Sequence, residues 1–149
     1  MTIVGPAGVE ARLESLFLAA WGEDWEPIRH RIPITYVEAD PEGMVAGISY
    51  QAVQLDHGLR GCTGYRLRIG DRLLAYSGDT IASPPLDRLV DGADVAIVEA
   101  TSPGEPFSHL GWEQAHALRD RHPGTRFFFV HVFEGTLEGA ASDLMVVDA

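Results

Sequence analysis

The sequence predicts an α/β protein in which helices flank a mixed β-sheet, and three observations support this fold class. Hydrophobic residues make up 46% of the 149 residues and charged residues 22%, a composition typical of globular rather than disordered chains. The first half contains short β-type segments joined by turn signals. The second half alternates apolar runs with helical patterns. Because neither a linker nor an internal repeat interrupts the chain, residues 1–149 are expected to form one domain.

The first half is predicted to contain one helix followed by short strands. Apolar residues recur at helical spacing over 9–21, which predicts an amphipathic helix. Two β-type segments, 33–39 and 44–50, lie on either side of an Asp-Pro-Glu-Gly turn signal. Alternation of apolar and polar residues then predicts a strand over 51–57, which ends in a histidine.

The second half is predicted to begin with a β-hairpin and to continue as alternating helices and strands. Gly70-Asp71 is a strong hairpin signal between two apolar segments. Prolines at the start of a helical pattern and Gly92 after its end indicate a short helix. The expected elements are strands 64–70 and 72–78, a helix within 84–94, a strand 95–100, a helix 112–122, a strand 125–133, and a last helical turn and strand within 137–147.

Charge and cysteine content restrict the possible partners and the compartment. The chain has 22 acidic residues against 11 basic ones, all arginine, so its net charge is −11. Such a chain should repel polyanions, because nucleic-acid affinity depends on neutralising phosphates, and we expect no nucleic-acid partner. A single cysteine, Cys62, precludes an intrachain disulfide and suits a reducing compartment. With neither a signal-peptide pattern nor a membrane-spanning run, the expected location is cytoplasmic.

Several residues capable of catalysis or metal binding follow apolar runs. His57, Asp79 and His131 each stand where a predicted strand ends, and His109 directly precedes a predicted helix. In α/β proteins such positions collect in one crevice, and imidazoles with carboxylates suit zinc and similar ions. Taken singly, each position has a structural explanation as a surface residue, a turn or a cap, and Glu99 can be a solvated strand end. The other histidines are expected on the surface: His30, His116 and His122.

The order of these residues resembles the second half of the metallo-β-lactamase fold, in particular its ribonuclease Z-like phosphodiesterase branch. The matching stretches are GPAG, HGLRGCTGYR, YSGDT, VEAT, SHLGWEQA and FVH. The resemblance implies that His57 and His131 each bind one of two metals and that Asp79 bridges them. It further implies that Glu99 orients His109, which assists departure of the leaving group. Zinc is the metal implied, with manganese or iron as alternatives.

The sequence also departs from this family. Val98 stands where the family motif has histidine, and Leu110-Gly111 replace Ser-Thr after His109. The family's first ligand cluster, His-x-His-x-Asp-His, has no counterpart, because no two histidines lie two residues apart. His57, Asp79 and His131 would give at most one terminal ligand per metal plus a bridge. Since zinc prefers three or four protein ligands, a half-site of this kind should bind metal weakly or not at all.

The expected fold is therefore half of a metallo-β-lactamase-type αββα sandwich, a mixed sheet flanked by helices. Half of such a sandwich leaves an apolar sheet face uncovered. Three explanations remain open: a piece of a longer chain, pairing with a separate chain that carries the N-terminal half, or a homodimer in which two copies cover each other. The first is the preferred expectation.

Three functions are compatible with these observations. The leading hypothesis is a metal-dependent hydrolase of a small phosphodiester or related ester, incomplete as this chain alone. A tRNA substrate is disfavoured by the negative charge and by the lack of a long insertion that could form a tRNA-binding arm. The alternative is a non-catalytic assembly or regulatory subunit that retains the half-fold. An unrelated α/β binding domain with Asp79 in a crevice ranks last, because it leaves the order of the other motifs unexplained.

Overall fold

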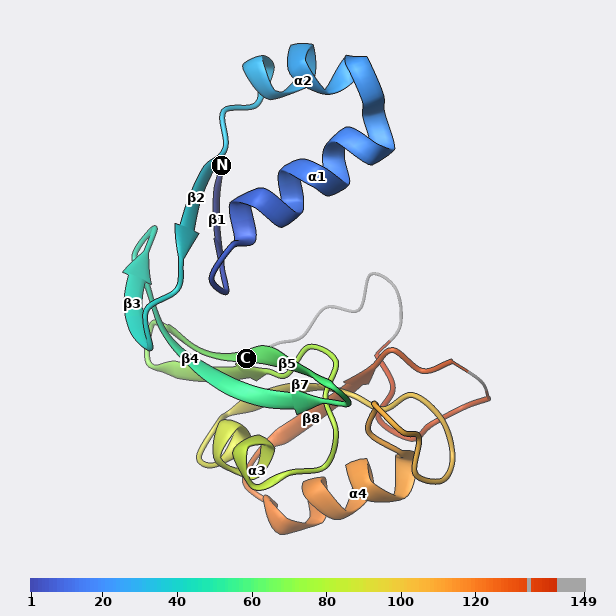
Figure 1. The fold of residues 1–149 in the computed structure, drawn as a ribbon. Helices are drawn as coiled ribbons and strands as arrows, with labels where there is room; N and C mark the ends of the chain where they lie inside the picture. Colours follow the sequence, from blue (N-terminus) through green and yellow to red (C-terminus); the bar gives the residue numbers. More distant parts are fainter. Residues whose placement is uncertain (134, 142–149) are drawn as a thin grey trace.

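The computed structural model describes residues 1–133 and 135–141 and contains two β-sheets (Figure 1). The larger sheet has six strands in the order β3-β4-β5-β6-β7-β8. Its strands are β3 (Glu42–Val45), β4 (Ile48–His57), β5 (Arg60–Ile69), β6 (Arg72–Tyr76), β7 (Val95–Glu99) and β8 (Arg126–Val130).

The large sheet is antiparallel from β3 to β6 and parallel from β6 to β8. The hairpin expected at Gly70-Asp71 is present and joins β5 to β6. Because parallel strands run in the same direction, β6, β7 and β8 all end at one edge of the sheet. That edge carries Asp79, Glu99 and His131, so the topology itself collects the residues that the sequence placed at strand ends.

Two helices, α3 (Pro84–Val90) and α4 (Trp112–Arg121), cover one face of the large sheet (Figure 1). Alternate residues of the strands point toward them, and together these side chains form the hydrophobic core. Leu55 of β4, Val98 of β7 and Phe129 of β8 are at most 1% exposed. From the helices, Leu86, Leu89 and Leu118 complete the same cluster.

A smaller layer stands on the other side of the large sheet (Figure 1). It consists of a two-stranded parallel sheet, β1 (Thr2–Gly5) and β2 (Thr35–Glu38), with α1 (Val9–Trp21), the short 3-10 helix η1 (Gly22–Asp24) and α2 (Trp25–Arg31) in the connection. Glu14 of α1 ties this layer together, since its carboxylate accepts hydrogen bonds from Trp25 Nε1 and from the Tyr36 hydroxyl, each at 2.8 Å. These two bonds lower the pKa of Glu14.

The structure corrects two of the expected elements and the expected exposure of one histidine. Residues 25–31 form α2, although Pro27 obscured the helical pattern; proline is tolerated there because it lies in the first helical turn. The segment 44–50 is not one strand but a hairpin, with Ala46 (φ 52°) and Gly47 (φ 81°) as the turn between β3 and β4. The side chain of His122 is only 13% exposed, because it packs between α3 and α4 and contacts Asp87 at 3.1 Å.

The outer edge of β8 is covered by residues that follow it in sequence. Phe129 donates its amide to the Gly139 carbonyl and accepts one from Ala141. Of the final helical turn and strand expected within 137–147, residues 142–147 lie outside the described residues. Within the described part, Ala140 forms an isolated bridge with Phe129. No helix in the described part of the chain is long and apolar enough to cross a membrane.

Candidate metal centre

Asp79 leaves the end of β6 through a sharp turn. Gly78 adopts a positive φ of 61°, which glycine accommodates without a steric cost. Ser77 stays paired with β7, because its amide donates to the Ile97 carbonyl. Beyond the turn, the Thr80 hydroxyl donates to the carbonyl of Asp56 at 3.0 Å, near the end of β4. The Asp79 carboxylate is thus held on a fixed loop and remains half exposed.

Glu99 is a fully buried carboxylate at the end of β7, with 1% of its surface exposed. A buried charge needs hydrogen-bond donors, and Glu99 has several. The Thr80 amide donates to Oε1, and the Thr101 hydroxyl donates to Oε2 at 2.7 Å. The backbone amide of Glu99 in turn donates to the Ser77 hydroxyl. This network holds the carboxylate in one orientation.

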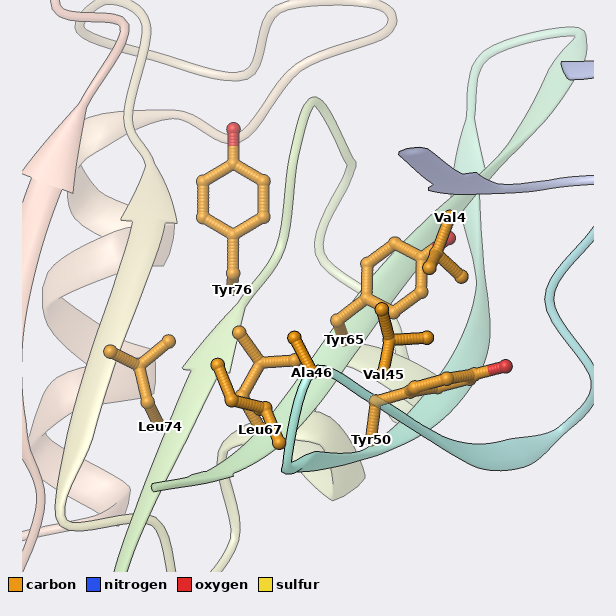
Figure 2. A pocket seen from close by; sticks show the side chains of 9 residues that line it. Val4, Val45, Ala46, Tyr50, Tyr65, Leu67, Leu74 and Tyr76 are labelled. Atoms are coloured by element: carbon orange, nitrogen blue, oxygen red, sulfur yellow. The ribbon is translucent and has the colours of Figure 1, made fainter. Parts of the chain in front are cut away.

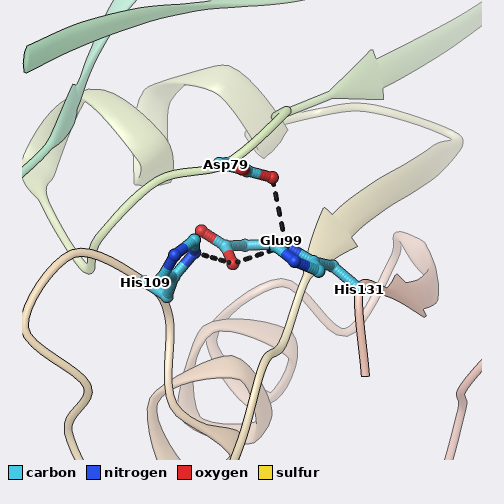
Figure 3. Close-up of side chains that lie close together, drawn as sticks. All are labelled: Asp79, Glu99, His109 and His131. Atoms are coloured by element: carbon cyan, nitrogen blue, oxygen red, sulfur yellow. Dashed lines mark hydrogen bonds and ion pairs between the residues drawn. The ribbon is translucent and has the colours of Figure 1, made fainter. Parts of the chain in front are cut away.

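Two imidazoles surround the same carboxylate (Figure 3). His109, from the loop before α4, places Nδ1 2.9 Å from Glu99 Oε2. His131, directly after β8, places Nδ1 3.5 Å from that oxygen and 3.1 Å from Asp79 Oδ1. His131 adopts a positive φ of 60°, an uncommon conformation for a residue with a side chain. A locally unfavourable backbone at such a site indicates that the surrounding structure imposes it.

The structure therefore brings together four of the five predicted site residues. One ligand atom from each of Asp79, Glu99, His109 and His131 lies within 4.8 Å of the others. Two imidazoles and two carboxylates form a nitrogen and oxygen donor set, which suits zinc, manganese or iron. The donor set fits a divalent cation, and the roles assigned to the individual residues remain predictions.

His57, the fifth predicted residue, lies beside this cluster but is not part of it. Its ring packs edge-on against that of His109, with centroids 4.9 Å apart. His57 Nδ1 lies 2.6 Å from the carbonyl oxygen of Ser108. Because a carbonyl only accepts, Nδ1 carries the hydrogen, and Nε2 keeps its lone pair for a ligand. This arrangement suits a metal ligand that requires other residues to complete its site.

Cys62 of β5 lies close to the candidate centre. Burial, and then the nearby carboxylates beginning with Glu99, raise the pKa of its thiol to about 11. The thiol is therefore protonated at neutral pH, whereas metal ligation requires the thiolate. In the described residues Cys62 is not one of the clustered ligands.

Sequence reasoning did not foresee the contribution of three hydroxyl residues. Ser77, Thr80 and Thr101 all contact Glu99, either through a hydroxyl group or through the backbone. Each lies within or directly beside a quoted motif, YSGDT or VEAT. Their signal in the sequence was a short spacing from Asp79 and Glu99. Spacing alone does not show that the segment after β6 meets the end of β7.

The family can now be stated from comparison with known proteins. Residues 1–132 match the beta-lactamase superfamily domain, so the chain belongs to the beta-lactamase superfamily. A search of curated proteins found no match.

Solved structures of low sequence identity share this fold. One is a diphosphatase from the PhnP family, with a TM-score of 0.68 and 15% identity over 89% of this chain and 47% of that chain. Another is the human tRNase Z, short form, with a TM-score of 0.66 and 16% identity over 99% of this chain and 66% of that chain. A third is Zn²⁺-bound PqqB from Methylobacterium extorquens, with a TM-score of 0.64 and 13% identity over 89% of this chain and 54% of that chain.

These matches confirm the predicted fold class. The mixed sheet with flanking helices is that of a metallo-β-lactamase fold fragment. The chain spans about half the length of the first solved relatives that it matches. Metal binding is implied by the superfamily, and the cluster of Asp79, Glu99, His109 and His131 is the possible site.

Proposed function

We propose that this chain forms the ligand-bearing C-terminal half of a metal-dependent hydrolase that cleaves phosphodiesters or related esters. The observation that carries the proposal is the convergence of Asp79, Glu99, His109 and His131 within 4.8 Å in a chain of this superfamily. Perturbed or clustered titratable groups at strand ends are typical of active sites in α/β proteins.

Asp79, His131 and His57 are the residues proposed to hold metal. Zinc is the proposed ion, and manganese or iron would suit the same donors. When bound, such an ion activates water and polarises the ester. Asp79 and His131 are already in contact at 3.1 Å, and both side chains are accessible. The residues that complete the coordination are expected from the half of the fold that this chain does not contain.

Glu99 and His109 are proposed to move the proton that the leaving group needs. The Glu99 carboxylate accepts from His109 Nδ1, so this contact fixes the tautomer and the orientation of the ring. His109 Nε2 is then the atom that can deliver a proton to a departing oxygen. Because Glu99 is itself held by Thr80 and Thr101, the imidazole has a rigid support.

The substrate proposed is a small phosphodiester or ester. Among the solved structures of this fold are a diphosphatase and a tRNase Z, which supports hydrolysis at phosphorus. The net charge of −11 disfavours long polyanions and hence tRNA. A reducing compartment such as the cytoplasm would suit the single, partly buried cysteine.

Metal binding by the chain gives the first test. Calorimetric titration with Zn²⁺ should show one weak site, and Asp79→Asn should weaken it at least tenfold. Asp71→Asn, in the exposed β5–β6 turn, is the matched control and should bind as the parent chain does. Equal binding by Asp79→Asn, or no binding by the parent chain at millimolar zinc, would contradict the proposed site.

Activity is tested after the missing ligands are supplied. The chain is fused to a family half that carries the His-x-His-x-Asp-His cluster, and hydrolysis of bis(4-nitrophenyl) phosphate is followed with zinc. We expect metal-dependent turnover in the fusion and a fall of 10²–10⁴-fold in kcat for His109→Ala. A well-folded, metal-loaded fusion without activity would count against a hydrolase.

A non-catalytic assembly subunit is the second candidate, favoured by the partly exposed apolar residues Ile48 and Tyr76 on the face of the large sheet beneath β1. It predicts that His131→Asn changes stability alone, with no effect on metal binding. The zinc titration of the same variant separates the two functions.

A further inference from the structure

Three exposed apolar side chains stand beside the three histidines of the site. Leu59 is 95% exposed, Phe107 82% and Phe133 76%, which makes them the most exposed large hydrophobic residues in the part of the chain that the structure describes. We call these three residues the apolar rim. Each stands two positions along the chain from one of the following residues: His57, His109 and His131, respectively.

The β4–β5 turn and the loop before α4 bring Leu59 and Phe107 to the same place. Leu59 lies with Gly58 in the two-residue turn between β4 and β5. The backbone of this turn packs against the loop, because a methyl group added at Gly58 would lie 2.9 Å from Cβ of Ser108 and 3.6 Å from Cε1 of Phe107. The bond of His57 Nδ1 to the Ser108 carbonyl joins the same two segments. The ring of Phe107 therefore lies beside the turn that carries Leu59.

Phe133 is fixed on the segment that follows β8. Its amide donates to the carbonyl of Thr101 at 2.9 Å, which ties this segment to the one after β7. Val132 packs against the hydrophobic core, whereas its two neighbours, His131 and Phe133, are exposed. The backbone thus holds Phe133 outside the core, on a segment that also carries a site residue.

The three segments of the apolar rim meet at the candidate metal centre. The ring of His109 packs edge-on against those of His57 and His131, with centroids 4.9 and 5.1 Å away. A single exposed apolar residue is ordinary, but several around one cluster of polar groups indicate a binding site. Ligand sites combine apolar walls with a few oriented polar groups. The apolar rim supplies such walls beside an otherwise polar centre.

The hollow beneath β1 is a different surface (Figure 2). It lies on the face of the large sheet and is lined by uncharged residues, among them Tyr50, Tyr65 and Leu67. That face is where the half of the fold that this chain does not contain is expected to pack. None of the three residues of the apolar rim lines this hollow, so the packing of that half on the face does not account for their exposure.

We propose that the apolar rim binds the organic groups of the ester, so that the site prefers aromatic or branched alkyl esters; this inference rests on the proposed function. Phe107 and His109 share one loop, and His109 is the residue proposed to protonate the departing oxygen. The leaving alcohol is therefore the group that contacts Leu59 and Phe107. Phe133, on the segment of His131, contacts the remaining organic group.

The chemistry of the apolar rim separates substrates of equal charge. An aromatic or branched alkyl group buries apolar area against these side chains, and two aromatic rings stack favourably. A polyhydroxylated or charged alcohol would lose hydration at the same place without gaining a hydrogen bond from them. The rim therefore selects by the apolar character of the alcohol, while the metal centre selects the phosphate or carboxyl head group.

Two phosphonates of equal charge test the apolar rim. Phenylphosphonate and methylphosphonate share one anionic head group and differ in the phenyl ring. Calorimetry on the zinc-loaded fusion with the family half should show phenylphosphonate bound about tenfold more tightly. In Phe107→Ser, and likewise in Leu59→Ser, this advantage should fall below about threefold. Phe107→Leu should retain most of it, because leucine keeps the apolar contact.

Met44→Ser is the matched control. Met44 is also exposed and apolar, at 68%, but it lies in β3, at the opposite end of the strand order from β8. This variant should keep the preference of the parent fusion for phenylphosphonate. Circular dichroism and the zinc content of each variant show that it is folded and loaded.

Equal affinity of the parent fusion for the two phosphonates, or no binding of either, would overturn the apolar rim. So would a full phenyl preference in both Phe107→Ser and Leu59→Ser. Variants that lose zinc or stability and bind both phosphonates equally poorly would assign the three residues to the contact between the halves, and would also overturn it. These measurements need no turnover. A fusion that prefers phenylphosphonate but cleaves no ester contradicts the hydrolase alone, and one that cleaves esters without this preference contradicts the rim alone.

Discussion

At the scale of single residues, Glu99 holds the side chains of the candidate metal centre in their arrangement. Its carboxylate accepts from the Thr80 amide, the Thr101 hydroxyl and His109, three groups from three different segments. Because Glu99 is 1% exposed, water cannot replace these bonds when the side chain is lost. Glu99 therefore supports both the local structure and the orientation of His109.

Glu99→Ala should lower the free energy of unfolding by roughly 2–3 kcal/mol, since it leaves the buried Thr80 amide without a partner and removes the acceptor of the partly buried Thr101 hydroxyl. Urea denaturation measures the change. Glu105→Ala, on an exposed loop, should alter stability by no more than about 0.5 kcal/mol. Equal effects of the two substitutions would show that the buried network contributes little.

The positions of the site residues were more predictable than their contacts. Asp79 and His131 follow apolar strands, and parallel strands end together, so their proximity follows from the pattern. The bond between Thr80 and Glu99 joins residues 19 positions apart, and local sequence does not encode which atoms meet. His57 was predicted as a metal ligand, but the structure places it against His109 rather than within the cluster.

At the scale of elements, hairpin and helix signals were informative where the residues had strong backbone preferences. Gly70-Asp71 marked its hairpin correctly. The Ala46-Gly47 hairpin was missed because alanine seldom adopts the positive φ of 52° that the turn requires. Helix α2 was missed because Pro27 obscured its pattern and because its anchors, the Trp25 bond to Glu14 and the packing of Trp25 on Phe17, lie outside the local pattern.

Helices α3 and α4 are joined by an ion-pair cluster at Asp87. Arg121 donates two hydrogen bonds to this carboxylate, at 3.0 and 2.9 Å, and His122 contacts it at 3.1 Å. The Arg121 bonds, and then those of His122, hold the pKa of Asp87 below its ordinary value. Protonation therefore favours the unfolded chain, in which the carboxyl has its ordinary affinity for protons.

The contribution of Asp87 should be complete at neutral pH and disappear as the pH falls below about 4. Asp87→Asn should cost about 0.5–1 kcal/mol at pH 7, a discounted value because the side chain is 39% exposed. Thermal unfolding is measured between pH 2 and 7. The unfolding midpoint of Asp87→Asn should fall less steeply with decreasing pH than that of the parent chain. Asp120→Asn, at an exposed position of α4, is the control and should keep the parent slope.

At the scale of the whole molecule, the two layers differ in how well they are packed. The large sheet buries its core against α3 and α4, whereas Leu16 (60%), Leu18 (59%) and Trp21 (54%) of α1 stay exposed. The half-fold expected from the sequence accounts for this asymmetry, because it predicts an uncovered sheet face. The sequence could not indicate the strand order of the two sheets, since that depends on pairing between distant segments.

The positive φ of His131 restricts which replacements can probe that position cleanly. Alanine would remove the imidazole and also introduce a backbone preference against the left-handed region, so its effect would combine chemistry with strain. Asparagine and glycine tolerate that conformation and isolate the loss of the ring. The same constraint narrows the natural variation open to this site: a drifting sequence that abandons the imidazole is expected to settle on asparagine, aspartate or glycine.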